Sequence, residues 1–161
     1  MTTTTNDLAA VVDALRSHER FLATTHENPD GDALGSLLAL TLGLRQLGKD
    51  VEMILGAQER VPAEYTSLPL DGLLRELPDD AAERVLVCLD CASEHRLTAT
   101  GLREHAPLVL DVDHHHDNTR FGDVNLIVPD ASSTAEIVAD LLAELRWSSP
   151  RRSPRRSTSP S

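Results

Sequence analysis

The stretch FLATTHENPDGDALGSLLALTLGLRQLGKDVEMIL, residues 21–55, decides the fold class. It opens with a short apolar run at 21–24 that is typical of a buried strand. Residues 32–47 then carry leucines at helical spacing, and Gly48 follows as a typical helix stop. A second apolar run follows at 51–55. The order strand, helix, strand indicates two parallel strands joined by a crossover helix.

The same alternation continues along the rest of the chain. We expect helices at 7–20 and 133–145, a weaker helix at 97–105, and strands at 85–89 and 108–112. Residues 56–83 hold three prolines, and we expect a loop there with a brief helix near 70–77. The whole pattern predicts an α/β fold in which a parallel sheet is flanked by helices.

The last helix begins with a capping box, Ser133-Thr134-Ala135-Glu136. In this motif the Ser133 hydroxyl accepts from the backbone N–H of Glu136, and the glutamate returns a hydrogen bond. The N–H groups of a helix N-terminus can also bind a phosphate, but capping alone explains Ser133 and Thr134.

Length and composition indicate an ordinary globular protein. The 161 residues suit one domain, and 40% are hydrophobic and 25% charged. No apolar run approaches the roughly 20 residues of a membrane span, and the first residues lack a secretory pattern. Cys88 and Cys91 form no disulfide framework, and we expect both to be packing residues. We therefore expect a cytoplasmic protein with no membrane partner.

Charge is distributed unevenly along the chain. Residues 1–145 hold all 26 acidic and 10 of the 15 basic residues, a balance of −16, which disfavours broad coating of nucleic acid. From Ser148 onward only Ser, Pro, Arg and Thr occur, so we expect residues 146–161 to be a disordered tail. The abrupt change favours a truncated or frame-shifted end over a basic tail that contacts nucleic acid.

Acidic and imidazole side chains follow three of the expected strands. They are the segment from His26 to Asp32, then Asp90, then the segment from Asp113 to Asn118. The carboxyl ends of neighbouring parallel strands share one crevice, so these groups can meet there. Asp and His together are more typical of a site for a cation such as Mn²⁺ than of a cysteine-rich zinc site. Two adjacent ions need about six donors and a bridging carboxylate, which the three segments supply.

Each segment also has a simpler interpretation. Residues 28–32 could form only a turn, with Asp32 capping the following helix. They do not fit a calcium EF-hand, because Ala33 occupies the position that requires glycine. Asp90 could be a surface acid at a strand end, and the three histidines a polar turn. The three segments taken together favour a metal site.

Four strings resemble successive motifs of the DHH phosphoesterases, in the order and spacing of that family. They are THENPDGDALGS at 25–36, VCLDCAS at 87–93, DVDHHHDN at 111–118 and SSTAEIVADLL at 132–142. The resemblance covers about residues 7–145. Within this family, the sequence is similar in particular to the bacterial oligoribonucleases that also dephosphorylate 3′,5′-bisphosphate nucleotides, which are relatives of RecJ-type exonucleases. It implies short RNA oligonucleotides or nucleotide phosphates as substrates, and a homodimer in full-length members.

The resemblance also implies site roles and a cofactor of two Mn²⁺ ions, with Mg²⁺ or Co²⁺ as alternatives. By this resemblance His26 and Asp30 would hold one ion, Asp32 and His114 the other, and Asp90 would bridge them. His115 would be catalytic and touch the substrate phosphate, while Asp113 and Asn118 would orient the imidazoles. Asp111 stands where relatives often carry asparagine.

The family pattern continues beyond the last helix of this chain. Family members add a strand with a further metal-binding aspartate, and then a substrate-binding DHHA1 domain. The resemblance therefore implies a partial DHH domain at 1–145 with weak or absent turnover. The alternatives are a manganese-dependent inorganic pyrophosphatase and a non-catalytic metal-binding fragment whose tail contacts nucleic acid.

Overall fold

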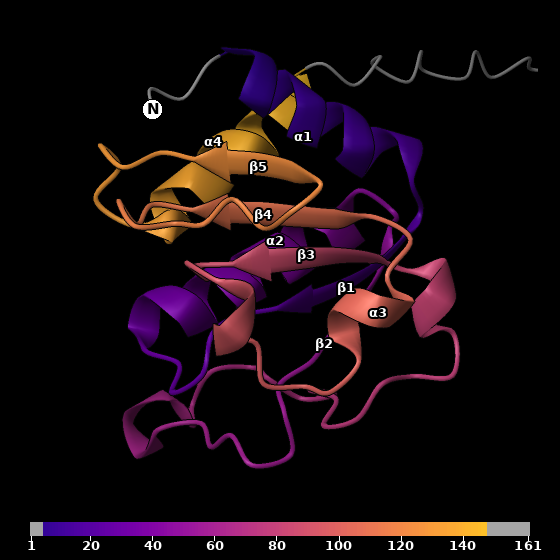
Figure 1. Ribbon diagram of the computed structural model, residues 1–161, viewed down its shortest axis with the longest axis vertical. Coiled ribbons are helices and arrows are strands. Elements are labelled where there is room, and N and C mark those ends of the chain that lie inside the picture. Colours follow the sequence, from indigo (N-terminus) through magenta and orange to yellow (C-terminus); the bar gives the residue numbers. More distant parts are fainter. Residues whose placement is uncertain (1–4, 148–161) are drawn as a thin grey trace, which may run out of the picture.

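A five-stranded, all-parallel sheet forms the centre of the molecule (Figure 1). The computed structural model describes residues 5–147, so the expected tail lies outside the described residues from 148 onward. The strands are β1 (Arg20–Thr24), β2 (Asp50–Met53), β3 (Val85–Leu89), β4 (Val109–Asp113) and β5 (Val124–Ile127). Their order in the sheet is β2-β1-β3-β4-β5. The predicted α/β class with a parallel sheet is confirmed.

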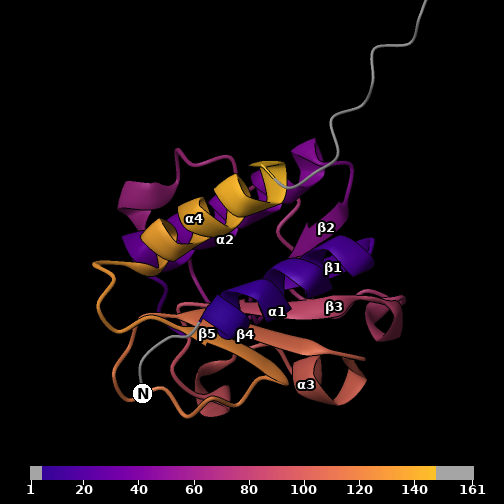
Figure 2. The ribbon, with the colours of Figure 1, turned by 90° about the horizontal axis from the view of Figure 1, so that it is seen from above.

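Helices cover the two faces of the sheet unequally (Figure 2). The helices are α1 (Thr5–Ser17), α2 (Gly31–Gln46), α3 (Leu102–His105) and α4 (Thr134–Trp147). Side chains of α1, α2 and α4 share the larger core with one face, whereas Leu102 of α3 packs on the other. Alternation along β1 follows this division, because Phe21 and Ala23 face the larger core and Leu22 faces the smaller one.

The strand order places a switch point between β1 and β3. The connection from β1 to β2 runs through α2 on one face, and the connection from β3 to β4 runs through α3 on the other. The loops that follow β1 and β3 therefore leave the sheet in opposite directions, which opens a crevice at the carboxyl ends of these strands.

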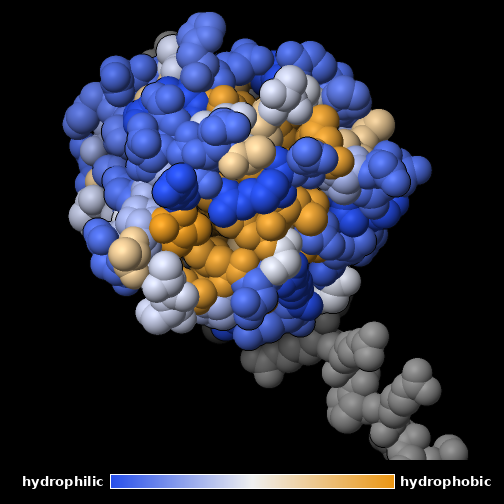
Figure 3. Space-filling view, turned by 90° about the horizontal axis from the view of Figure 1, so that it is seen from below, coloured by the Kyte–Doolittle hydropathy of each residue, from blue (hydrophilic) through white to orange (hydrophobic). Residues whose placement is uncertain are grey.

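The connection between β2 and β3 differs from the prediction. No helix forms near 70–77, because Leu74 pairs with Ile54 beside the sheet edge instead, and the turns Ala63–Tyr65 and Ala81–Glu83 are single 3₁₀ turns. Leu68, Leu70 and Leu73 are partly buried against the larger core. Figure 3, the view from below, shows an apolar area framed by polar residues on the side of the molecule where this connection lies in Figure 1.

Two other elements were predicted poorly. Of the weak helix expected at 97–105, only the last four residues are helical, as the single turn of α3, whereas residues 97–101 form an irregular segment that ends in a turn. Strand β5 was missed, because its four residues include Asn125, whose side chain is bonded to the backbone of Gly122. Within residues 5–147 no helix is both long and apolar enough to span a membrane.

The capping box of α4 is confirmed in one half and shifted in the other. The Ser133 Oγ accepts from Glu136 N at 3.2 Å, as predicted. The Glu136 carboxylate accepts from Ser132 and not from Ser133, at 2.9 Å from the Ser132 backbone N and 2.7 Å from its Oγ.

A buried arginine joins the amino ends of the first strands. The Arg84 guanidinium donates to the backbone oxygen of Phe21 at 3.1 Å, to both carboxylate oxygens of Asp50 at 3.1 and 3.2 Å, and to Asp80 at 2.9 Å. The planar guanidinium of an arginine can bond both oxygens of a carboxylate, which the ammonium of a lysine does less well. Arg84 therefore connects β1, β2 and the turn before β3.

The substitution Arg84→Ala should lower the free energy of unfolding by about 1–3 kcal/mol, because it removes the buried guanidinium that donates to the Phe21 backbone oxygen, to Asp50 and to Asp80. Arg60→Ala, at an exposed position, is the control and should change it by less than about 0.5 kcal/mol. Urea unfolding followed by circular dichroism measures both. Equal effects of the two substitutions would contradict a structural role for Arg84.

Candidate metal centre

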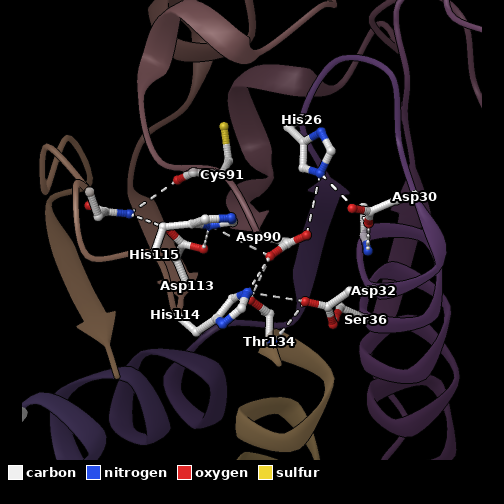
Figure 4. Close-up of polar contacts among 12 residues, drawn as sticks. His26, Asp30, Asp32, Ser36, Asp90, Cys91, Asp113, His114, His115 and Thr134 are labelled. Atoms are coloured by element: carbon white, nitrogen blue, oxygen red, sulfur yellow. Dashed lines mark hydrogen bonds and ion pairs between the residues drawn. The ribbon is translucent and has the colours of Figure 1, made fainter. Parts of the chain in front are cut away.

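Imidazole and carboxylate side chains from three segments meet at the crevice (Figure 4). His26 lies two residues beyond β1, Asp90 directly follows β3, and His114 directly follows β4. Asp30 and Asp32 flank Gly31, the first residue of α2. Because β1 and β3 are paired neighbours, the ends of these strands bring His26 and Asp90 together. The structure thus gathers the residues that the sequence singled out.

One group consists of His26, Asp30 and Asp90, called here the His26 group. His26 Nε2 lies 3.3 Å from Asp90 Oδ2 and 3.9 Å from Asp30 Oδ1. Its Nδ1 donates to the carbonyl oxygen of Glu27 at 2.5 Å, so Nε2 is the nitrogen that faces the carboxylates. Hydrogen bonding to Asp90 raises the pKa of His26, although burial of the ring opposes this. A metal-binding histidine commonly has this arrangement, with one nitrogen bonded to a backbone carbonyl.

The second group consists of His114, Asp32 and Asp90, called here the His114 group. His114 Nε2 lies 3.4 Å from Asp32 Oδ2 and 3.4 Å from Asp90 Oδ1. Asp90 therefore presents Oδ2 to the first group and Oδ1 to the second. One carboxylate lies between two sets of candidate ligands.

Asp90 is held firmly in this position. Its backbone has a positive φ of 58°, a conformation that aspartate tolerates better than most residues, and its N–H donates to Val112 O at 3.0 Å. The side chain is buried, and Thr134 Oγ1 donates to Oδ1 at 2.9 Å. Backbone strain of this kind is typical of functional sites.

The N-terminus of α4 holds Asp32. Thr134 N donates to Asp32 Oδ2 and Ala135 N donates to Oδ1, each at 3.0 Å. Burial acts to raise the pKa of Asp32, but these N–H groups outweigh it and hold the pKa below its ordinary value. The interpretation of Asp32 as a cap of the following helix is wrong, because Asp30 caps α2 by accepting from Ala33 N. The N–H groups considered above for a phosphate are bonded to Asp32 and Ser133 instead.

His115 is oriented by a chain of hydrogen bonds. Its Nδ1 donates to Asp113 Oδ1 at 2.7 Å, and Asn118 Nδ2 donates to Asp113 Oδ2 at 2.7 Å. Asn118 therefore acts on the imidazole through Asp113. About a third of the His115 side chain is exposed, and its ring centroid lies 4.6 Å from that of His114.

Asp111 is a buried acid that the sequence did not single out for the site. Its Oδ2 accepts from Asn118 Nδ2 at 2.9 Å, and its Oδ1 has no hydrogen-bond partner among the described residues. Burial raises the pKa of Asp111 to about 8, assisted by the charge of Asp113 and opposed by Asn118 and Arg120. One amide thus serves two buried carboxylates, and burial favours the protonated form of Asp111.

Both cysteines are free and buried. Burial raises the pKa of Cys91 to about 12, and its Sγ donates to Ser93 O at 3.1 Å. A thiol with such a raised pKa is a poor nucleophile and metal ligand.

The spacing of the candidate ligands suits divalent cations. The ligand atoms of His26, Asp30 and Asp90 lie within 4.8 Å of one another, as do those of Asp90, His114 and His115. Ligands about 2.1 Å from a common ion lie roughly 3.0–3.5 Å apart, close to the nitrogen–oxygen distances found here. His115 Nδ1 is bonded to Asp113, so it is less available to an ion than His114 Nε2 is. The ligands that fit a second ion best are therefore His114, Asp90 and Asp32, which form the His114 group.

The fold and the centre define an α/β protein with a candidate site for metal ions at its switch point. Residues 20–158 match the model of the DHH family, N-terminal domain. The chain belongs to the DHH family, as the four motifs predicted.

The chain is similar to several known proteins. It is 32% identical over 118 residues to the bifunctional oligoribonuclease and PAP phosphatase NrnA of Thermus thermophilus, a match that covers 73% of this chain and 35% of NrnA. An exopolyphosphatase-related protein from Bacteroides fragilis shares the fold with a TM-score of 0.75 at 24% identity, over 89% of this chain and 44% of that one. The exonuclease RecJ bound to manganese gives a TM-score of 0.53 at 22% identity, over 93% and 40%. The chain spans less than half the length of each.

The first prediction from this centre concerns Asp111. An acid whose pKa is higher in the folded than in the unfolded state lowers the free energy of unfolding as the pH rises between the two pKa values. For Asp111 this range runs from near 4 in the unfolded state to about 8 in the folded state. Asp111→Asn removes this loss. The variant should therefore gain about 2–4 kcal/mol relative to the unmodified chain between pH 5 and pH 8, measured by urea unfolding with a chelator present. Asp13→Asn, at an exposed position of α1, is the control. A difference that does not change with pH would refute the protonated Asp111.

The second prediction concerns the cation. Mn²⁺ at about 100 times its dissociation constant should raise the free energy of unfolding by about 2.7 kcal/mol, and a chelator should reverse the gain. Asp90→Asn should abolish most of the gain, because Asp90 belongs to both groups. Asp123→Asn should retain it, because Asp123 accepts from Val109 N at the amino end of β4, the opposite end of the strand from the centre. Thermal denaturation with and without Mn²⁺ measures the effect, and a full gain in Asp90→Asn would count against the site.

Proposed function

We propose that this chain is a Mn²⁺-dependent phosphoesterase that hydrolyses phosphate esters of short oligoribonucleotides or 3′,5′-bisphosphate nucleotides. The observation that carries the proposal is the position of Asp90, with one carboxylate oxygen toward His26 and the other toward His114. Membership of the DHH family and similarity to NrnA support the substrate class.

We assign the ligands of the two cations to residues of this chain. His26 and Asp30 would hold one ion, Asp32 and His114 the other, and Asp90 both. When bound, two such ions supply an activated water as nucleophile and offset the charge on the phosphoryl oxygens. The hydrogen bond from His26 Nδ1 to the Glu27 carbonyl oxygen and those from the α4 N–H groups to Asp32 fix these ligands in advance. Preorganised ligands need little rearrangement when the ion binds.

His115 would contact the substrate. Its Nδ1 proton is bonded to Asp113, which leaves Nε2 on a partly exposed ring to face the incoming phosphoryl group. Asp113 thereby fixes the orientation of the imidazole toward the position of a phosphoryl oxygen. The Asn118 amide keeps Asp113 in place for this task.

The variant His115→Gln should lower Mn²⁺-dependent turnover of a dinucleotide or adenosine 3′,5′-bisphosphate by about 100-fold or more, because it removes the imidazole that would contact the phosphate. Its affinity for Mn²⁺ should stay within about twofold. His116→Gln is the matched control, since His116 is the exposed neighbour of His115 in the chain.

Three substrates are assayed in parallel: nucleoside monophosphate is measured as the product of short RNA, and inorganic phosphate as the product of the bisphosphate nucleotide and of pyrophosphate. Preferred hydrolysis of pyrophosphate would instead support a pyrophosphatase. RNA binding that is lost on deletion of residues 146–161, without any hydrolysis, would support the non-catalytic fragment. Hydrolysis that persists in a chelator would reject the metal mechanism.

A further inference from the structure

We infer that Thr134 is a positioning residue for the His114 group: its hydroxyl and its backbone N–H hold the two carboxylates on which an ion there depends. The inference rests on the proposed function, because it takes Asp32 and Asp90 as ligands of that ion. It assigns a role to the first residue of α4, which lies far along the chain from both carboxylates.

The hydroxyl of Thr134 fixes the rotation of the Asp90 carboxylate. Thr134 is fully buried, and its Oγ1 donates to Asp90 Oδ1 at 2.9 Å. This is the oxygen that lies 3.4 Å from His114 Nε2, whereas Oδ2 faces His26. The hydroxyl also directs its proton to Oδ1, which leaves the other lone pairs of that oxygen for a cation.

The backbone of the same residue holds the second carboxylate. Thr134 N donates to Asp32 Oδ2, the oxygen that lies 3.4 Å from His114 Nε2. Ala135 N donates to Asp32 Oδ1, and Ser36 Oγ lies 3.3 Å from the same oxygen. Asp32 is thus placed by α4 as much as by its own helix.

Close packing of α2 on α4 maintains this arrangement. Gly43 of α2 faces Leu142 of α4 so closely that a Cβ on Gly43 would lie 2.5 Å from the leucine side chain. At the far end of the pair, Arg146 Nη2 donates to Gln46 Oε1 at 2.8 Å. The two helices lie side by side in Figure 2. The position of Thr134 therefore depends on contacts along the whole helix pair.

The contacts of Thr134 make the expected effect unequal. His26 and Asp30 receive no contact from Thr134 among the hydrogen bonds of the described residues, and Asp90 Oδ2 faces away from its hydroxyl. Loss of the hydroxyl should weaken the ion of the His114 group and spare the ion of the His26 group. A purely structural threonine would weaken both or neither.

The experiment is a calorimetric Mn²⁺ titration of the full chain. The unmodified protein should bind two ions. In Thr134→Val, which keeps the shape and the backbone N–H, one ion should bind about 10-fold more weakly or worse, and the other should stay within about twofold. Thr134→Ser keeps the hydroxyl and should stay within about threefold for both ions. Thr41→Val is the matched control, because Thr41 is equally buried but donates to Leu37 O within α2.

The outcomes separate the two proposals. If the unmodified chain binds no Mn²⁺, the proposed function fails. If it binds two ions and Thr134→Val binds both unchanged, or loses both equally, only the role of Thr134 is overturned. Equal losses in Thr134→Ser and Thr134→Val would also overturn it. If circular dichroism shows that Thr134→Val does not fold, Thr134→Ala replaces it under the same criteria.

Discussion

A carboxylate buried at the end of a strand needs compensation from its neighbours, and the Asp90 side chain meets this constraint from three directions. His26 approaches from the end of β1, His114 from the end of β4, and the Thr134 hydroxyl from α4. An unpaired buried charge would cost several kcal/mol, so these partners have to be in place for the chain to fold as it does. The pairing of β3 with both β1 and β4 makes the arrangement geometrically available.

The same constraint links the fold to the chemistry. The two imidazoles that contact Asp90 in the folded chain are those that would bind cations together with it, and a metal ion at His26 Nε2 would take the place of a proton there. Asp32 is held by helix N–H groups in a way that keeps it charged. Asp111 lies one step further from the centre and is held in the opposite state, because burial favours its protonated form. The centre thus combines carboxylates of different protonation within one network.

Local patterns were sufficient to predict the strands that position His26, Asp90 and His114. Their apolar runs are short and bounded by polar residues, and such runs can be recognised as buried strands without tertiary information. The sheet edge was harder: β5 contains Asn125, and Leu70, Leu73 and Leu74 have helical spacing but pack separately onto the edge of the sheet and its core. Tertiary packing overrode the local pattern there.

The relations that complete the centre could not be predicted from the sequence. Asp32 and Thr134 are 102 residues apart, and only the docking of α4 on α2 shows that one holds the other. The capping box did mark Thr134 as the start of a helix, but not which carboxylate would meet its N–H. Similarly, the raised pKa of Asp111 depends on burial between strands, which an isolated DVDHHH string does not reveal.

A crystal structure of the chain grown with Mn²⁺, with data recorded at the manganese absorption edge, tests the central claim most directly. The account predicts two anomalous peaks, one beside each Asp90 oxygen, with His26 on one and His114 on the other. A single peak away from Asp90, or none at saturating Mn²⁺, would contradict it.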